Sequence, residues 1–184
     1  QLGFLVIEEI PAVGLQVSAE QENIDKRRAA CDQYLEEIIL RDKNHPLVII
    51  WCVANEPYYQ GMGGANYNGK EQQGNDRENE QAIACLGGLI DQAKAMDPTR
   101  LATFVGVSGG PASWLGVCDL ICINRYYGWY TNPGDLEGAI DILDKELDRL
   151  HTLYGKPIML TEFGADAIAG EHSESAAMFS EEFQ

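Results

Sequence analysis

The chain has 184 residues, 45% of them hydrophobic and 23% charged, which is the composition of a folded globular domain. Its formal net charge of −16 argues against nucleic acid and anionic membrane surfaces as partners, because both attract a basic protein surface. The sequence contains no apolar run of transmembrane length and no visible signal peptide.

Strands and helices alternate in the first half of the chain. Residues 4–7 form an apolar run that predicts a strand, and apolar residues then recur at helical spacing over 24–41. Ser18 and Gln21 have the spacing of a capping box, which predicts that the helix starts beside them. The apolar run over 47–54 predicts the next strand.

The second half of the chain continues this alternation. Its predicted elements are a polar surface loop over 60–75, a helix over 77–96, strands over 101–107 and 120–123, a helix over 136–154 and a strand over 158–160. Gly155 has the position expected for the left-handed residue that ends a helix. Each helix is expected to bury one apolar stripe, with Ile83, Leu86, Ile90 and Ala93 in the first and Leu136, Ile140, Leu143, Leu147, Leu150 and Tyr154 in the second.

This order of elements predicts an α/β fold with a parallel sheet and right-handed crossovers. Two architectures fit, a doubly wound open sheet and a partial (β/α)8 TIM barrel. No glycine-rich phosphate loop follows any predicted strand, which lowers the dinucleotide-binding option. Polar residues at the C-terminal ends of the strands favour the barrel, because these ends converge there on one mouth. They are Glu8, Glu9, Asn55, Glu56, Asn124, Tyr126 and Glu162.

Two of the strand ends carry a glutamate, Glu56 within Asn-Glu-Pro and Glu162 after Thr161. If both line one mouth about 5–5.5 Å apart, they have the separation that a retaining glycosidase uses. One carboxyl then stays protonated as the acid, and the other is ionised and attacks the anomeric carbon. Repulsion between them raises one pKa and not the other, but the spacing does not say which. The alternative is two unrelated carboxylates that cap helix N-termini.

Three stretches resemble a known family. They are "NHPLVIIWCVANEP" over 44–57, "ICINRYYGWY" over 121–130 and "KPIMLTEFGADAIAGEHS" over 156–173. Together they resemble the catalytic barrel of glycoside hydrolase family 2, and the similarity covers almost the whole chain except residues 60–75. Asn-Glu-Pro alone is shared by a broad clan of retaining glycosidases, whereas the other two stretches are more specific.

The resemblance implies a retaining exo-β-glycosidase that hydrolyses terminal β-D-glucuronides through a covalent glycosyl-enzyme intermediate. It implies that Glu56 is the acid/base and Glu162 the nucleophile. It implies further that Asn55 binds the sugar 2-hydroxyl, that Tyr126 orients the nucleophile, and that Asn124 and Tyr130 face the sugar. No metal or other cofactor is expected, because two carboxylates suffice for this chemistry. For Tyr127 and Trp129, core packing and a place in the wall of the mouth both remain open.

The resemblance also implies that residues 1–184 are part of a longer protein. They correspond to barrel strands three to seven, so strands one, two and eight and the two β-sandwich domains that precede the family's barrel are expected elsewhere. The longer protein is expected to be a homo-oligomer, and the loop over 60–75 to wall the aglycone side of the site. The alternatives are a β-galactosidase or related family 2 enzyme, and an inactive carbohydrate-binding fragment.

Five cysteines are present, at positions 31, 52, 85, 118 and 122. Their number is odd and no pair has zinc-finger spacing, so they are interpreted as reduced residues. Such cysteine usage favours a cytoplasmic location.

Overall fold

The computed structural model describes residues 3–62 and 70–184. Its main sheet has five parallel strands in the order β1-β3-β5-β6-β7. Their bounds are Val6–Glu9 for β1, Val48–Asn55 for β3, Leu101–Gly106 for β5, Ile121–Asn124 for β6 and Ile158–Glu162 for β7. Two short strands, β2 (Gln16–Ser18) and β4 (Tyr58–Tyr59), pair in a separate parallel ribbon that the sequence analysis did not predict.

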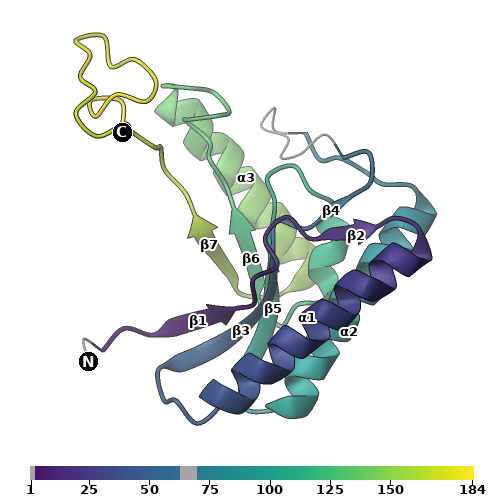
Figure 1. The fold of residues 1–184 in the computed structure, drawn as a ribbon. Coiled ribbons are helices and arrows are strands. Elements are labelled where there is room, and N and C mark those ends of the chain that lie inside the picture. The colour runs from purple at the N-terminus through teal and green to yellow at the C-terminus, as the bar shows by residue number, and fades with distance from the viewer. Residues whose placement is uncertain (1–2, 63–69) are drawn as a thin grey trace.

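Three helices cover one side of the curved sheet (Figure 1). They are α1 (Gln21–Asp42), α2 (Asp76–Met96) and α3 (Leu136–Tyr154), and a 3₁₀ segment, η1 (Ala112–Val117), follows β5. Gly155 ends α3 in the left-handed conformation at φ +60°, as predicted. The strands follow one another across the sheet in chain order, whereas a doubly wound sheet reverses its strand order at a switch point. The partial (β/α)8 barrel is therefore confirmed.

The side chains of the sheet alternate between two apolar layers. Trp51 and Val53 of β3 face the helices and join the large cluster that Leu35 of α1 and Leu86 of α2 complete. The alternate side chains lie on the concave face, where a small second cluster forms around Cys52. The large cluster fixes the sheet to its helices, so the C-terminal strand ends are held at one rim.

The predicted capping box at Ser18 and Gln21 is wrong. Ser18 is the last residue of β2 and pairs with Tyr59, so its backbone is extended, and α1 begins at Gln21 with Glu20 as an N-cap that makes no side-chain bond. A complete capping box instead starts α2, where Asn75 and Glu78 each bond the other's backbone N–H.

Three predicted inward positions are also wrong. Ile83 of α2 is 36% exposed, because it lies beside the buried stripe of the helix and not within it. The buried residues of α2 are Ala82, Cys85, Leu86, Leu89, Ile90 and Ala93. At the start of α3, Leu136 and Ile140 are 68% and 59% exposed. No other helix among the described residues covers this side of α3, so only the stripe facing the sheet is buried.

Candidate active site

The C-terminal ends of β3, β6 and β7 meet around one pocket of about 530 Å³. Glu56 follows β3 directly, and Glu162 is the last residue of β7. Both line this pocket, together with Tyr126, Trp129, Tyr130, Thr161, Phe163, Gly164, Ala165 and Asp166. The two strand-end carboxylates, 106 positions apart in the sequence, therefore share a single cavity.

The backbone at Glu56 is held in an unusual conformation. Its φ of +51° is in the left-handed region, which is uncommon for a residue with a side chain. Its N–H donates to the carbonyl of Val105 on β5 at 2.9 Å, and the carbonyl of Asn55 accepts from the N–H of Gly14 at 2.8 Å. These bonds on both sides of the turn hold the left-handed residue in place where β3 ends.

Asn124 connects the strand ends beneath the pocket. Its Nδ2 donates to Oδ1 of Asn55 at 3.2 Å and to Oε1 of Glu56 at 3.1 Å, while its Oδ1 accepts from the Thr161 hydroxyl at 2.8 Å. Asn124 is fully buried and is not among the residues that line the pocket, and its expected contact with the sugar stays a prediction.

The environment of Glu56 favours its protonated form. Burial raises the pKa of the Glu56 carboxyl, and the negative charge of Glu162 raises it further. The hydrogen bond from Asn124 and the positive charge of Arg125 act in the opposite direction but do not outweigh burial. Glu56 is therefore the carboxyl of the pair that is suited to hold a proton.

Glu162 lies in a more open environment. It is exposed at the end of β7, and its Oε2 accepts a short hydrogen bond from the hydroxyl of Tyr126. The Glu162 carboxyl is thus surrounded by solvent and one hydroxyl donor, whereas Glu56 is partly buried and bonded to an amide. The two glutamates thus differ in burial and in their hydrogen-bond partners.

Aromatic side chains form one wall of the pocket. Trp129 and Tyr130 stack with ring centroids 3.9 Å apart, and Tyr126 meets each of them edge-on at 5.7 Å. Trp129 is 7% exposed and also contacts Phe179, so it is both a packed residue and part of the wall. Tyr127 is half-buried outside this wall and donates its hydroxyl to Glu146 of α3 at 2.8 Å.

Two residues near the pocket were missed by the sequence analysis. Arg125, directly after Asn124, is buried and forms a bidentate ion pair with Glu146. Its Nη2 and Nε lie 2.7 and 2.8 Å from the two carboxylate oxygens. A single arginine and a single helix glutamate 21 positions apart give no pattern that a sequence could reveal. Only the packing of α3 against β6 brings them together.

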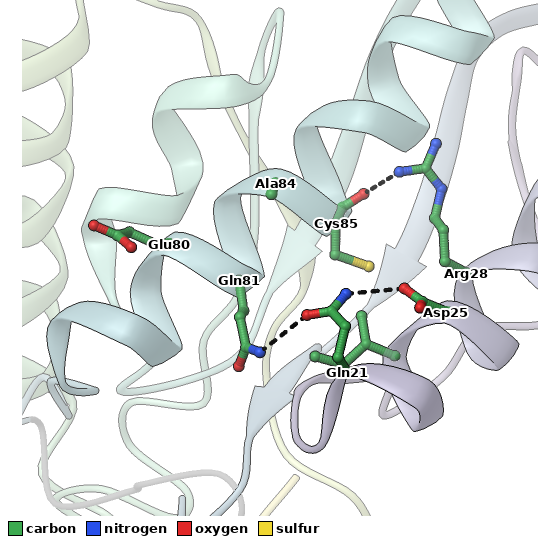
Figure 2. A pocket seen from close by; sticks show the side chains of 8 residues that line it. Gln21, Asp25, Arg28, Glu80, Gln81, Ala84 and Cys85 are labelled. Carbon is green, nitrogen blue, oxygen red and sulfur yellow. Dashed lines mark hydrogen bonds between the residues drawn. The ribbon is translucent and has the colours of Figure 1, made fainter.

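A second hollow, of about 330 Å³, lies between α1 and α2 on the outer helical layer (Figure 2). Its polar groups mostly bond to one another, for example Gln21 to Asp25 at 2.9 Å and Arg28 to the carbonyl of Cys85 at 3.2 Å. It holds neither strand-end glutamate, because its lining comes from α1 and α2 alone. We therefore place the chemistry in the pocket between Glu56 and Glu162.

Within residues 3–62 and 70–184, no group of three or more His, Cys, Asp or Glu side chains could hold a metal ion. No helix within them is long and apolar enough to cross a membrane. All five cysteines are buried and free.

Comparison with known proteins gives matches over the whole chain. The family model described as "Glycosyl hydrolases family 2, TIM barrel domain" matches residues 1–184. β-Glucuronidases of Sus scrofa and Homo sapiens are 38% and 36% identical to it over 99% of its length. The chain spans 25% of the length of these curated relatives.

Solved structures give the same result. A β-glucuronidase from an uncultured Clostridium species superposes with a TM-score of 0.78 at 32% identity, over 98% of this chain and 29% of that one. The Bifidobacterium dentium β-glucuronidase complexed with coumarin-3-O-glucuronide gives 0.75 at 36% identity, over 98% of this chain and 27% of that one.

Proposed function

The chain belongs to the glycosyl hydrolases family 2, in the TIM barrel domain, and on this premise we propose that it carries the catalytic pair of a retaining exo-β-glycosidase. The observation that carries the proposal is the shared pocket of Glu56 and Glu162, whose surroundings differ. A retaining glycosidase needs one protonated and one ionised carboxyl on either side of the anomeric carbon.

In the proposed mechanism, Glu56 donates its proton to the glycosidic oxygen while Glu162 attacks the anomeric carbon. The bond to the aglycone breaks and a covalent bond from the sugar to Glu162 forms. Glu56, now ionised, then takes a proton from water, and the resulting attack releases the sugar and regenerates both carboxyls. The raised pKa of Glu56 fits a group that must hold a proton before the first step.

The neighbouring side chains have supporting roles in this proposal. Asn55 donates the N–H₂ of its carboxamide to the sugar 2-hydroxyl, while its Oδ1 accepts from Asn124. Tyr126 orients Glu162 through their hydrogen bond, and Tyr130 forms the wall against the sugar ring. Asn124 holds Glu56 through their hydrogen bond, and we propose that it also faces the sugar.

We propose terminal β-D-glucuronides as substrates. The support comes from relatives: matched structures include a β-glucuronidase of Ruminococcus gnavus in complex with D-glucuronic acid, at 32% identity and a TM-score of 0.75. A β-galactosidase or a related family 2 enzyme is the alternative. A panel of nitrophenyl β-glycosides that differ only at C4 and C5 of the sugar discriminates between them.

We further propose that residues 1–184 form barrel strands three to seven of a longer, homo-oligomeric protein with two β-sandwich domains. The chain spans 25% of the length of a curated relative, which supports the part of this proposal that concerns a longer protein. The predicted role of the loop over 60–75 lies partly outside the described residues, since 63–69 are not among them. Deleting the loop and comparing small with bulky aglycones tests that role.

The experiment for the proposed function is a pair of substitutions in the full-length protein. Glu162→Gln should abolish turnover of every aryl β-glucuronide, because no nucleophile remains. Glu56→Gln should abolish turnover of substrates with poor leaving groups but spare those whose leaving group needs no proton. Ordinary activity of either variant on a poor leaving group would refute the assignment.

A further inference from the structure

Arg125 is the most deeply buried charged side chain beside the pocket, with a side-chain exposure of 4%. Its Nε and Nη2 donate to the two carboxylate oxygens of Glu146 on α3, at 2.8 and 2.7 Å. Its Nη1 points the other way, to the carbonyls of Asn124 at 2.7 Å, Val107 at 3.2 Å and Gly106 at 3.3 Å. One side chain therefore binds the C-terminal ends of β5 and β6 to α3.

The backbone of Arg125 extends this connection to β7. Its N–H donates to the carbonyl of Glu162 at 2.9 Å. On β5, the carbonyl of Val105 accepts from the N–H of Glu56. The next carbonyl, that of Gly106, accepts from the guanidinium of Arg125. The main chains of both pocket glutamates are thus attached to the strand ends that Arg125 holds.

Glu146 holds the guanidinium of Arg125 in place. Although burial favours its neutral form, the hydrogen bonds and charge of Arg125 outweigh burial and lower the pKa of the Glu146 carboxyl. The hydroxyl of Tyr127 supplies a further donor at 2.8 Å. A partly buried carboxylate that accepts three hydrogen bonds, on a long helix, fixes the plane of the guanidinium.

We propose that Arg125, anchored by Glu146, is a positioning residue that holds the ends of β5, β6 and β7 and thereby sets the geometry between Glu56 and Glu162. The inference rests on the proposed function where kcat is measured. The effect on the distance between Glu56 and Glu162 does not depend on that function. Lysine cannot replace the arginine, because an ammonium group lacks the planar fork that reaches a carboxylate and several carbonyls together.

The chain offers a matched control at the opposite end of the sheet. Arg100 is also largely covered, with a side-chain exposure of 15%, pairs with Asp97 at 2.6 Å, and donates to the carbonyls of Val48, Lys43 and His45. These groups surround the N-terminal end of β3, away from the pocket. Arg100→Lys therefore removes a comparable set of bonds without touching the strand ends that carry the glutamates.

The experiment compares Arg125→Lys, Glu146→Gln and Arg100→Lys in the full-length protein. All three should lower the melting temperature. Arg125→Lys should also lower kcat about 100-fold while KM stays within about threefold, because small displacements of catalytic groups act on the transition state. Glu146→Gln should lower kcat in the same way, and it gives a second variant should Arg125→Lys fail to fold. Arg100→Lys should keep the kcat of the wild type.

Crystal structures of the same variants separate this inference from the proposed function. If the wild type hydrolyses no β-glucuronide, the proposed function fails. The positioning role is still supported if the distance between Glu56 and Glu162 changes in Arg125→Lys and stays the same in Arg100→Lys. Unmoved glutamates in Arg125→Lys overturn it. A kcat within threefold of the wild type in Arg125→Lys, or an equal loss in Arg100→Lys, also overturns it.

Discussion

At the scale of single residues, the pocket gives two identical side chains different surroundings. Tyr126 contributes to this difference, because its hydroxyl donates to Glu162 and not to Glu56. We expect Tyr126→Phe in the full-length protein to lower kcat by about 100-fold, the usual cost of one lost active-site donor. KM should change little, since the ring and its edge-on contacts with Trp129 and Tyr130 remain. Steady-state kinetics check this, and an unchanged kcat would exclude an orienting role for the hydroxyl.

Asp97 gives a prediction about pH. Burial favours its neutral form, but hydrogen bonds from Thr99, Arg100 and Trp51 outweigh burial and lower the pKa of the carboxyl from 3.8 to about 2. A lowered pKa means that Asp97 stabilises the fold above pH 4 and that this contribution is lost as the pH falls through 2. Asp97→Asn should therefore cost about 2 kcal/mol at pH 7. Melting temperatures of both proteins should converge as the pH falls toward 2, and a constant difference would argue against ionisation as the cause.

Residues of the pocket differ in how far the sequence revealed them. Glu56 and Glu162 were found because each follows an apolar run, and a buried strand that ends in a carboxylate is conspicuous. The hydrogen bonds of Asn124 to Asn55, Glu56 and Thr161 were not predicted, since strand alternation gives the face of a side chain but not its hydrogen-bond partners. Arg125 and Glu146 were missed because their pairing depends on how α3 packs.

At the scale of elements, apolar periodicity located every strand of the main sheet and all three helices, with ends that differ by a few residues. The ribbon of β2 and β4 was missed, because strands of three and two residues are too short to show an apolar period. This omission also explains the wrong capping box, since Ser18 was interpreted as the start of a helix when it belongs to β2.

The two helix starts give a paired prediction. Asn75 caps α2 through a complete capping box, whereas Glu20 precedes α1 without a side-chain bond. Asn75→Ala should therefore destabilise the protein by about 1 kcal/mol, and Glu20→Ser should stabilise it by a similar or smaller amount. Thermal melts of the full-length variants measure both effects. Equal changes of the same sign would show that the local caps do not determine the stability of these helices.

At the scale of the whole molecule, the described residues form half of a barrel with two open edges. β1 pairs only with β3, and β7 pairs only with β6. Large apolar side chains are exposed along both edges, including Phe4 at 71% and Phe163 at 75%. On the concave face only five residues form a buried cluster, because the opposite wall of a closed barrel is needed to cover it.

The open edges lead to a prediction for the 184-residue chain expressed on its own. Unpaired strand edges bind other chains, and an uncovered concave face leaves apolar surface in water, so we expect low solubility and a loosely packed state. The large cluster between sheet and helices should keep secondary structure, which predicts a far-ultraviolet circular dichroism signal together with strong binding of a hydrophobic dye. The full-length protein is the control, with little dye binding and a cooperative melt. A sharp cooperative melt of the 184-residue chain alone would show that the outer apolar layer suffices for a native fold, and that closing the barrel serves the pocket rather than stability.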